Sequence, residues 1–108
     1  ALLNQKDKHY TEAYNGINML IEQYPANAIA YAARGGMEKE KGQFEAAEYD
    51  YAKAMELDAD NADYVLNHLD LLILLKRRNE AYADLQRLIK MGYSKGQLLE
   101  FYNRLKKK

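Results

Sequence analysis

Residues 28–61 read AIAYAARGGM EKEKGQFEAA EYDYAKAMEL DADN, and this stretch decides the fold. It is rich in Ala, Glu, Lys and Met, which are strong helix formers. Gly42 interrupts the run near its middle, and Asn27 stands before it as a residue suited to cap the start of a helix. The stretch therefore predicts two helices, at 28–41 and 45–57, joined by a tight turn.

A spacing of 34 residues recurs along the chain. Ala13, Ala47 and Ala81 follow it, each in the second helix of an expected helix pair. A small side chain is required where two helices cross closely, and bulky side chains fill the layers on either side. We therefore expect helical hairpins whose helices cross at these three alanines, with the alanines buried. Further sets keep the same step: Tyr10 with Phe44; Ile17 with Tyr51 and Leu85; Leu20 with Ala54 and Leu88; and Asn27 with Asn61.

These residues resemble the tetratricopeptide repeat (TPR) family, whose 34-residue unit carries aromatic, Gly, Ala and Pro residues at set positions. The middle repeat matches best, although Ala59 replaces the closing Pro. The resemblance implies an all-α fold, a right-handed α–α superhelix of helical hairpins with a C-terminal capping helix. The matching positions are Tyr31, Gly35, Gly42, Phe44, Ala47, Tyr51 and Ala54.

The same register divides residues 1–108 into the parts of a single domain. Residues 1–27 resemble a partial first repeat, 28–61 a second and 62–95 a third. Residues 96–108 are expected to form a helix that caps the end of the array; the alternative is that they begin a fourth repeat.

The third repeat departs from the family's pattern. Leu69 occupies the glycine position and Lys76 replaces the glycine of the turn, which leaves the packing of this repeat open but not its helical character. Asn61 and Asn79 are placed to cap the helices that follow them. Besides the two helices of the middle repeat, helices are expected at 1–7, 11–23, 62–76, 80–91 and 95–107.

The composition is that of one folded domain. The chain has 108 residues, of which 48% are hydrophobic and 30% charged. Its 16 basic and 16 acidic residues cancel, so the basic excess typical of nucleic-acid binders is missing. The longest apolar run, residues 71–75, is far shorter than the roughly 20 residues of a membrane-spanning helix. The absence of Cys leaves the cellular compartment open.

Charge is nevertheless uneven along the chain. Residues 28–61 carry 4 basic and 8 acidic groups, whereas residues 62–108 carry 10 basic and 5 acidic groups. Such a gradient could orient the protein against a partner. The three lysines at 106–108, however, are expected to form a solvated tail.

The segment from Gly92 to Gly96 matches G-x-S-x-G, the turn that carries the nucleophile of many serine hydrolases. That motif needs a preceding strand and a later acid and His, whereas here a helical pattern precedes Ser94 and both histidines come before it. We instead expect Gly92 to close a helix in a left-handed conformation and Ser94 to form a capping box with Gln97.

No catalytic residue, metal site or cofactor is expected. His9 and His68 are isolated histidines without the H-E-x-x-H arrangement, and each is interpreted as a solvated or packing residue. Phosphate-binding glycine loops are missing, and most tyrosines fall at core positions of the repeat. The carboxylates are expected on a solvated face; they include Glu45, Glu48, Asp50, Asp58 and Asp60.

Surface recognition remains, and the TPR resemblance implies where it takes place. In that family the first helix of each pair lines a concave groove that holds a peptide or helix of a partner. Leu66, Ile73 and Leu74 are expected to anchor the partner; the alternative is that they pack against neighbouring helices. The partner-binding residues carried over by register are Lys39, Glu40, Asp63, Leu66, Asp70, Ile73 and Leu74.

Some members of the family clamp the C-terminal carboxylate of a partner with Lys, Asn and Arg side chains. The corresponding positions in this chain include Ala33, Asp63 and Asn67, so the required cations are missing. A carboxylate clamp at those positions is therefore not expected, because the surface there would repel an anion.

The sequence thus predicts a non-catalytic scaffold that binds a protein or peptide segment in its concave groove. The alternative is a structural spacer or self-association module within a longer multi-repeat protein, which would allow a homodimer. Neither hypothesis involves an enzyme, a nucleic acid or a membrane span.

Overall fold

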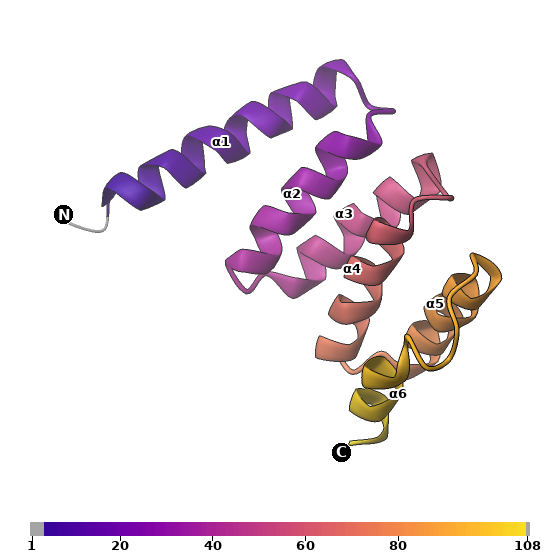
Figure 1. The fold of residues 1–108 in the computed structure, drawn as a ribbon. Helices are drawn as coiled ribbons and strands as arrows, with labels where there is room; N and C mark the ends of the chain where they lie inside the picture. Colours follow the sequence, from indigo (N-terminus) through magenta and orange to yellow (C-terminus); the bar gives the residue numbers. More distant parts are fainter. Residues whose placement is uncertain (1–3, 108) are drawn as a thin grey trace.

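The computed structural model describes residues 4–107, with side chains from His9 onward. This part of the chain contains six helices and no strand, so the all-α prediction is confirmed. From α2 to α5, each helix turns back beside the one before it, α6 contacts α4, and the row of helices curves along the molecule (Figure 1). The helices are α1 Asn4–Gln23, α2 Ala28–Glu40, α3 Phe44–Leu57, α4 Ala62–Leu74, α5 Arg78–Lys90 and α6 Leu99–Lys106.

Two helical hairpins, α2 with α3 and α4 with α5, form the core of the structure. Ala47 in α3 and Ala81 in α5 are fully buried, as the 34-residue spacing predicts. Leu71 of α4 packs with Ala47 and Tyr51, so it joins the first hairpin to the second. The larger apolar cluster lies in the second hairpin and under α6; its buried members are Val65, Leu69, Leu72, Ala81, Leu85, Leu88, Leu98 and Leu105.

Side chains at the helix starts confirm two of the three asparagines predicted as N-caps. The Oδ1 atom of Asn27 accepts a hydrogen bond from the N–H of Ala30 at 3.2 Å. The Oδ1 atom of Asn61 accepts from the N–H of Asp63 at 3.0 Å. These bonds satisfy amide groups that have no partner within the helix.

The third predicted cap, Asn79, is wrong, because α5 starts earlier and has Arg77 at its N-cap. The reversal of the chain explains the shift. Lys76 takes a left-handed conformation with φ of 63°, and the N–H of Arg77 donates to the carbonyl of Leu72 at 2.9 Å. This arrangement ends α4 at Leu74, two residues before the expected boundary.

The prediction of two separate N-terminal helices, at 1–7 and 11–23, is also wrong for the residues that the structure describes. Residues 1–3 of the expected first helix lie outside the described residues, and from Asn4 to Gln23 the chain is one continuous helix. No Gly or Pro stands between residues 7 and 11 to interrupt it.

The prediction that Ala13 is buried is wrong. In α3 the equivalent alanine is covered by α2, the helix before it, but the described residues contain no helix before α1. The equivalent alanines are covered, whereas Ala13 is exposed, and Leu20 is 38% exposed.

The last helix is shorter than expected. Residues 95–98 form a turn, and α6 begins at Leu99. The expected capping box is present at the start of this turn. The Ser94 N–H donates to Oε1 of Gln97 at 2.8 Å, and the Gln97 N–H donates to Oγ of Ser94 at 3.1 Å. Leu105 is buried against the second hairpin, so α6 covers its end as predicted.

A close helix crossing at Gly35 determines the packing of the first hairpin. A Cβ atom added to Gly35 would lie 2.8 Å from Cδ2 of Tyr51 and 3.3 Å from the carbonyl oxygen of Ala47. The aromatic ring therefore occupies the space that any other residue would need. Gly16 in α1, by contrast, would meet no atom within 4 Å.

We expect Gly35→Ala to lower the free energy of unfolding by about 1–3 kcal/mol, because the new methyl group overpacks the crossing. Gly16→Ala is the matched control and should leave stability unchanged or raise it by up to about 1 kcal/mol, since Ala favours helix. Urea unfolding followed by circular dichroism measures both. Equal effects of the two substitutions would contradict the crossing geometry.

Candidate binding surface

A row of charged side chains crosses α2, α4 and α6 and marks one face of the molecule. Nζ of Lys39 lies 2.6 Å from Oδ2 of Asp70, and Nη1 of Arg104 lies 2.6 Å from Oδ1 of the same carboxylate. Burial opposes ionisation of Asp70, but the hydrogen bonds from Lys39 and Arg104 hold the pKa of its carboxyl below the usual value. The row therefore links α2 to α4 and α4 to α6.

The structure separates the residues predicted to bind a partner into three groups. Lys39 and Asp70 contact each other in the charged row. Leu66 and Ile73 are partly buried against the apolar core, so the alternative that they pack against neighbouring helices holds for these two. The remaining predicted residues stay exposed; they are Glu40, Asp63 and Leu74, the last with 42% of its surface accessible.

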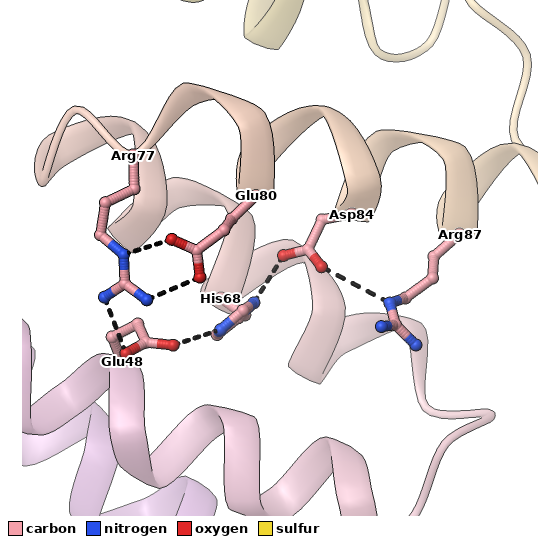
Figure 2. A network of polar contacts seen from close by, with 6 residues as sticks. All are labelled: Glu48, His68, Arg77, Glu80, Asp84 and Arg87. Carbon is pink, nitrogen blue, oxygen red and sulfur yellow. Dashed lines mark hydrogen bonds and ion pairs between the residues drawn. The ribbon is translucent and has the colours of Figure 1, made fainter.

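A buried polar network, which the sequence did not predict, joins α3, α4 and α5 (Figure 2). Nδ1 of His68 lies 2.5 Å from Oδ2 of Asp84, and Nε2 lies 2.7 Å from Oε2 of Glu48. Burial alone would lower the pKa of His68, but the two carboxylates raise it above its ordinary value of 6.5. His68 is therefore a packing residue held between two carboxylates.

Two arginines extend this network toward the surface (Figure 2). The guanidinium of Arg77 donates to both carboxylate oxygens of Glu80 at 2.7 Å and to Oε1 of Glu48 at 3.0 Å. At the other end, Nε of Arg87 lies 3.6 Å from Oδ1 of Asp84. The expectation that Glu48 belongs to a solvated acidic face is thus wrong, because this carboxylate links α3 to the second hairpin.

A related pair holds the first hairpin together. Arg34 donates two hydrogen bonds of 2.8 Å to the carboxylate of Asp50 and one of 3.0 Å to Oδ1 of Asn18 in α1. Asp50 is buried, so its predicted place on a solvated face is also wrong. Arg34 and His68, like Asp50 and Asp84, stand 34 residues apart. A cation paired with an Asp therefore recurs in both hairpins, a spacing that the sequence analysis missed.

Glu38 lies beside this pair and receives a hydrogen bond of 2.6 Å from the hydroxyl of Tyr14 in α1. Burial and the neighbouring Asp50 raise the pKa of Glu38 to about 7, although Tyr14 and Arg34 act in the opposite direction. The same hydrogen bond raises the pKa of Tyr14 to about 12. The contact between α1 and α2 thus includes a carboxyl group that titrates near neutral pH.

Neither network is arranged for catalysis. Both ring nitrogens of His68 are engaged by carboxylates, so no nitrogen is left to accept a proton from a reacting group. Within residues 4–107 there is also no group of three His, Cys, Asp or Glu side chains able to hold a metal ion. In the same range, no helix is both long and apolar enough to cross a membrane. The networks hold helices together, and the partly exposed charged row is the better candidate for recognition.

We expect the free energy of unfolding to fall as pH rises above 5, in two windows. Glu38 ionises at its ordinary pKa of 4.5 in the unfolded chain but at about 7 in the folded one, so stability falls between these values. His68 has a raised pKa when folded; its stabilisation is complete below 6.5 and is lost as pH rises through the folded value. Urea unfolding between pH 5 and 9 measures both effects.

Two variants separate the windows. Glu38→Gln should flatten the profile between pH 5 and 7, and His68→Gln should flatten it above 6.5. Asp70 and Glu80 do not interfere, because their lowered pKa values matter only at more acidic pH. A wild-type profile without slope, or identical profiles for the two variants, would contradict the assignment.

No protein-family model and no curated protein matches the sequence. Several solved structures, however, have a similar fold. The chain is similar to the Arabidopsis OM64 TPR domain, with 28% identity and a TM-score of 0.76 over 96% of this chain and 86% of that one. It is similar in fold to the TPR2B domain of yeast Sti1 in its complex with pHsp70, with 18% identity and a TM-score of 0.73 over 94% and 86% of the two chains.

A third neighbour is the Yersinia enterocolitica type III secretion chaperone SycD, solved in complex with a peptide of the translocator YopD. The identity is 15%, and the TM-score is 0.71 over 96% of this chain and 79% of that one. The paired helices, the 34-residue spacing and these structural neighbours show that the chain has an all-α, TPR-like helical-repeat fold.

Proposed function

We propose that the protein is a non-catalytic interaction scaffold that binds a peptide or helix of a partner protein on the face formed by α2, α4 and α6. Two neighbours of the same fold support this proposal, since the Sti1 domain was solved with pHsp70 and SycD with a YopD peptide. The observation that carries it is the charged row of Lys39, Asp70 and Arg104, which crosses three helices beside the exposed Leu74.

Each of the proposed binding residues has a physical role. Leu74 gives the partner an apolar contact, and Leu66 and Ile73 supply the partly buried surface beneath it. Lys39 and Asp70 orient the bound segment through charge. The exposed acidic groups at the edge of the face are Glu40 and Asp63. Because few apolar groups are exposed here, we expect modest affinity.

A structural spacer or self-association module remains the second candidate. The observation that favours it is the outer surface of α1, where Met19 is 62% exposed and where Ala13 and Leu20, which share one side of the helix, are also exposed. The residues equivalent to Ala13 in α3 and α5 are covered by the preceding helix. A second copy of the chain could cover this side of α1 and form a homodimer.

We expect Leu74→Asp to weaken peptide binding by about tenfold, which corresponds to about 1.4 kcal/mol. Peptides selected from a displayed library against the wild-type protein serve as ligands, and isothermal titration calorimetry measures their affinity. Leu57→Asp in α3 is the matched control, because Leu57 is 39% exposed and lies on the second helix of its hairpin. This variant should bind as the wild type does.

Failure to select any peptide, or equal binding by the two variants, would contradict the proposal. Analytical ultracentrifugation of the same proteins tests the second candidate. A dimer that forms with rising concentration and is lost in Leu74→Asp or Met19→Asp would favour self-association over peptide binding.

A further inference from the structure

A cavity of about 180 Å³ lies at one end of the proposed binding face, where the last residues of α4 and α6 meet the turn into α5. Leu105 is buried and, with the partly buried Ile73, gives the cavity its apolar surface. The volume is well below the roughly 300 Å³ at which small-molecule sites begin. The cavity therefore suits a side chain of a larger ligand. It is lined by Ile73, Lys76, Arg78, Arg104, Leu105 and Lys107, which we call the cationic pocket.

Four of these six side chains are cationic and none is acidic. The charge of Arg104 is partly balanced by Asp70, and Arg78 donates a hydrogen bond of 2.8 Å to the main-chain carbonyl of Lys107. Neither Lys76 nor Lys107 forms an ion pair with an acidic side chain of the described part of the chain. The pocket therefore keeps a positive charge that its own surroundings do not neutralise.

The backbone at Lys76 gives a second, independent observation. Its φ of 63° is the only left-handed conformation of a non-glycine residue within residues 4–107. The corresponding residues after α2 and α5 are Gly42 and Gly92, for which positive φ is favourable. A lysine at such a position is less stable than a glycine would be. The fold thus tolerates a strained residue at the end of α4, which borders the pocket.

We propose that the cationic pocket is the part of the binding face that receives an acidic segment of the partner peptide, with an apolar side chain against Ile73 and Leu105 and carboxylates on the surrounding cations. This inference rests on the proposed function and names the chemistry of its ligand. The pocket does not coincide with Ala33, Asp63 and Asn67, the positions at which a carboxylate clamp is not expected. The expectation that this surface repels anions therefore does not extend to the pocket.

A peptide fits these charges better than a nucleic acid or an anionic membrane does. Polyanion binding needs an extended basic surface, whereas the net charge of this chain is zero and residues 28–61 carry 8 acidic against 4 basic groups. Glu40 and Asp63 lie on the same helices as the binding face and are exposed. A long polyanion would meet these carboxylates, but a short acidic segment confined to the pocket would not.

The probe for the test is a fluorescein-labelled peptide, Gly-Leu-Glu-Glu-Leu-Asp-Asp-Gly, and fluorescence anisotropy measures its affinity at 50 mM and 300 mM salt. Lys76→Gly is the central variant, because it should raise the melting temperature by relieving the strained backbone and yet weaken binding about threefold. Combined with Lys107→Gln it should weaken binding by about tenfold. Lys53→Gln in α3 is the matched control and should change nothing, since Lys53 lies outside the pocket.

Asp70→Asn tests the same site from the opposite direction. Its amide would no longer neutralise Arg104, so the acidic peptide should bind severalfold more tightly. The peptide with Gln and Asn in place of Glu and Asp should lose binding to every variant. Higher salt should weaken binding of the acidic peptide, because part of the attraction is between charges near the surface.

The inference is overturned if Lys76→Gly binds the acidic peptide as the wild type does, or if single-stranded DNA or phosphatidylserine vesicles compete equally well with the peptide. The proposed function is judged separately. If Leu74→Asp weakens the binding of library-selected peptides but Lys76→Gly does not, the result would support the proposed binding face and contradict the acidic subsite.

Discussion

The distance at which paired helices cross is the constraint on which the structure depends. In the first hairpin, Gly35 allows the ring of Tyr51 to lie against the backbone of α2. In the second hairpin the same two positions hold Leu69 and Leu85, both fully buried. One large ring packed against bare backbone is thus replaced by two medium-sized side chains, one from each helix. The two hairpins can therefore stack, although only the first follows the family's glycine pattern.

Charged pairs set the register between these hairpins where apolar packing alone would be less specific. Arg34 with Asp50 and His68 with Asp84 occupy equivalent places, and each cation also contacts the preceding helix, through Asn18 and Glu48 respectively. Removing one partner would leave a buried charge uncompensated, which costs far more than an exposed ion pair contributes. Sliding a helix by one turn would have the same effect, so the pairs oppose alternative packings.

The sequence predicts those features that depend on neighbouring residues or on the repeat itself. Asn27 and Asn61 cap their helices because their side chains reach amides two or three residues ahead. Asn79 fails because the left-handed Lys76 shifts the turn, and a non-glycine residue in that conformation leaves little trace in the sequence. The predicted burial of Ala13 is wrong because burial also requires a covering helix.

The candidate binding surface was predicted less completely. Lys39 and Asp70 were assigned to it by register, but Arg104 was missed, although it stands 34 residues after Asp70. The burial of Asp50 could also have been predicted, because Asp84 stands 34 residues later at the equivalent position of the next repeat. The cationic pocket could not, because its residues come from two helix ends and a turn that meet only after α6 folds against α4.

The charged row shows that cations on this face can stabilise an ionised carboxylate. Asp70 already lies between Lys39 and Arg104, each at 2.6 Å, and the two cations stabilise its ionised form despite partial burial. The side chains that hold it come from separate helices, so their positions are set by packing of the helices. A carboxylate supplied by a partner in the neighbouring pocket would meet Arg104 from its other side, together with Lys76 and Lys107. Because Asp70 holds Arg104 in place before any ligand arrives, this side chain would lose little conformational entropy on binding. The same internal carboxylate competes for Arg104, so the structure that organises the site also limits its affinity.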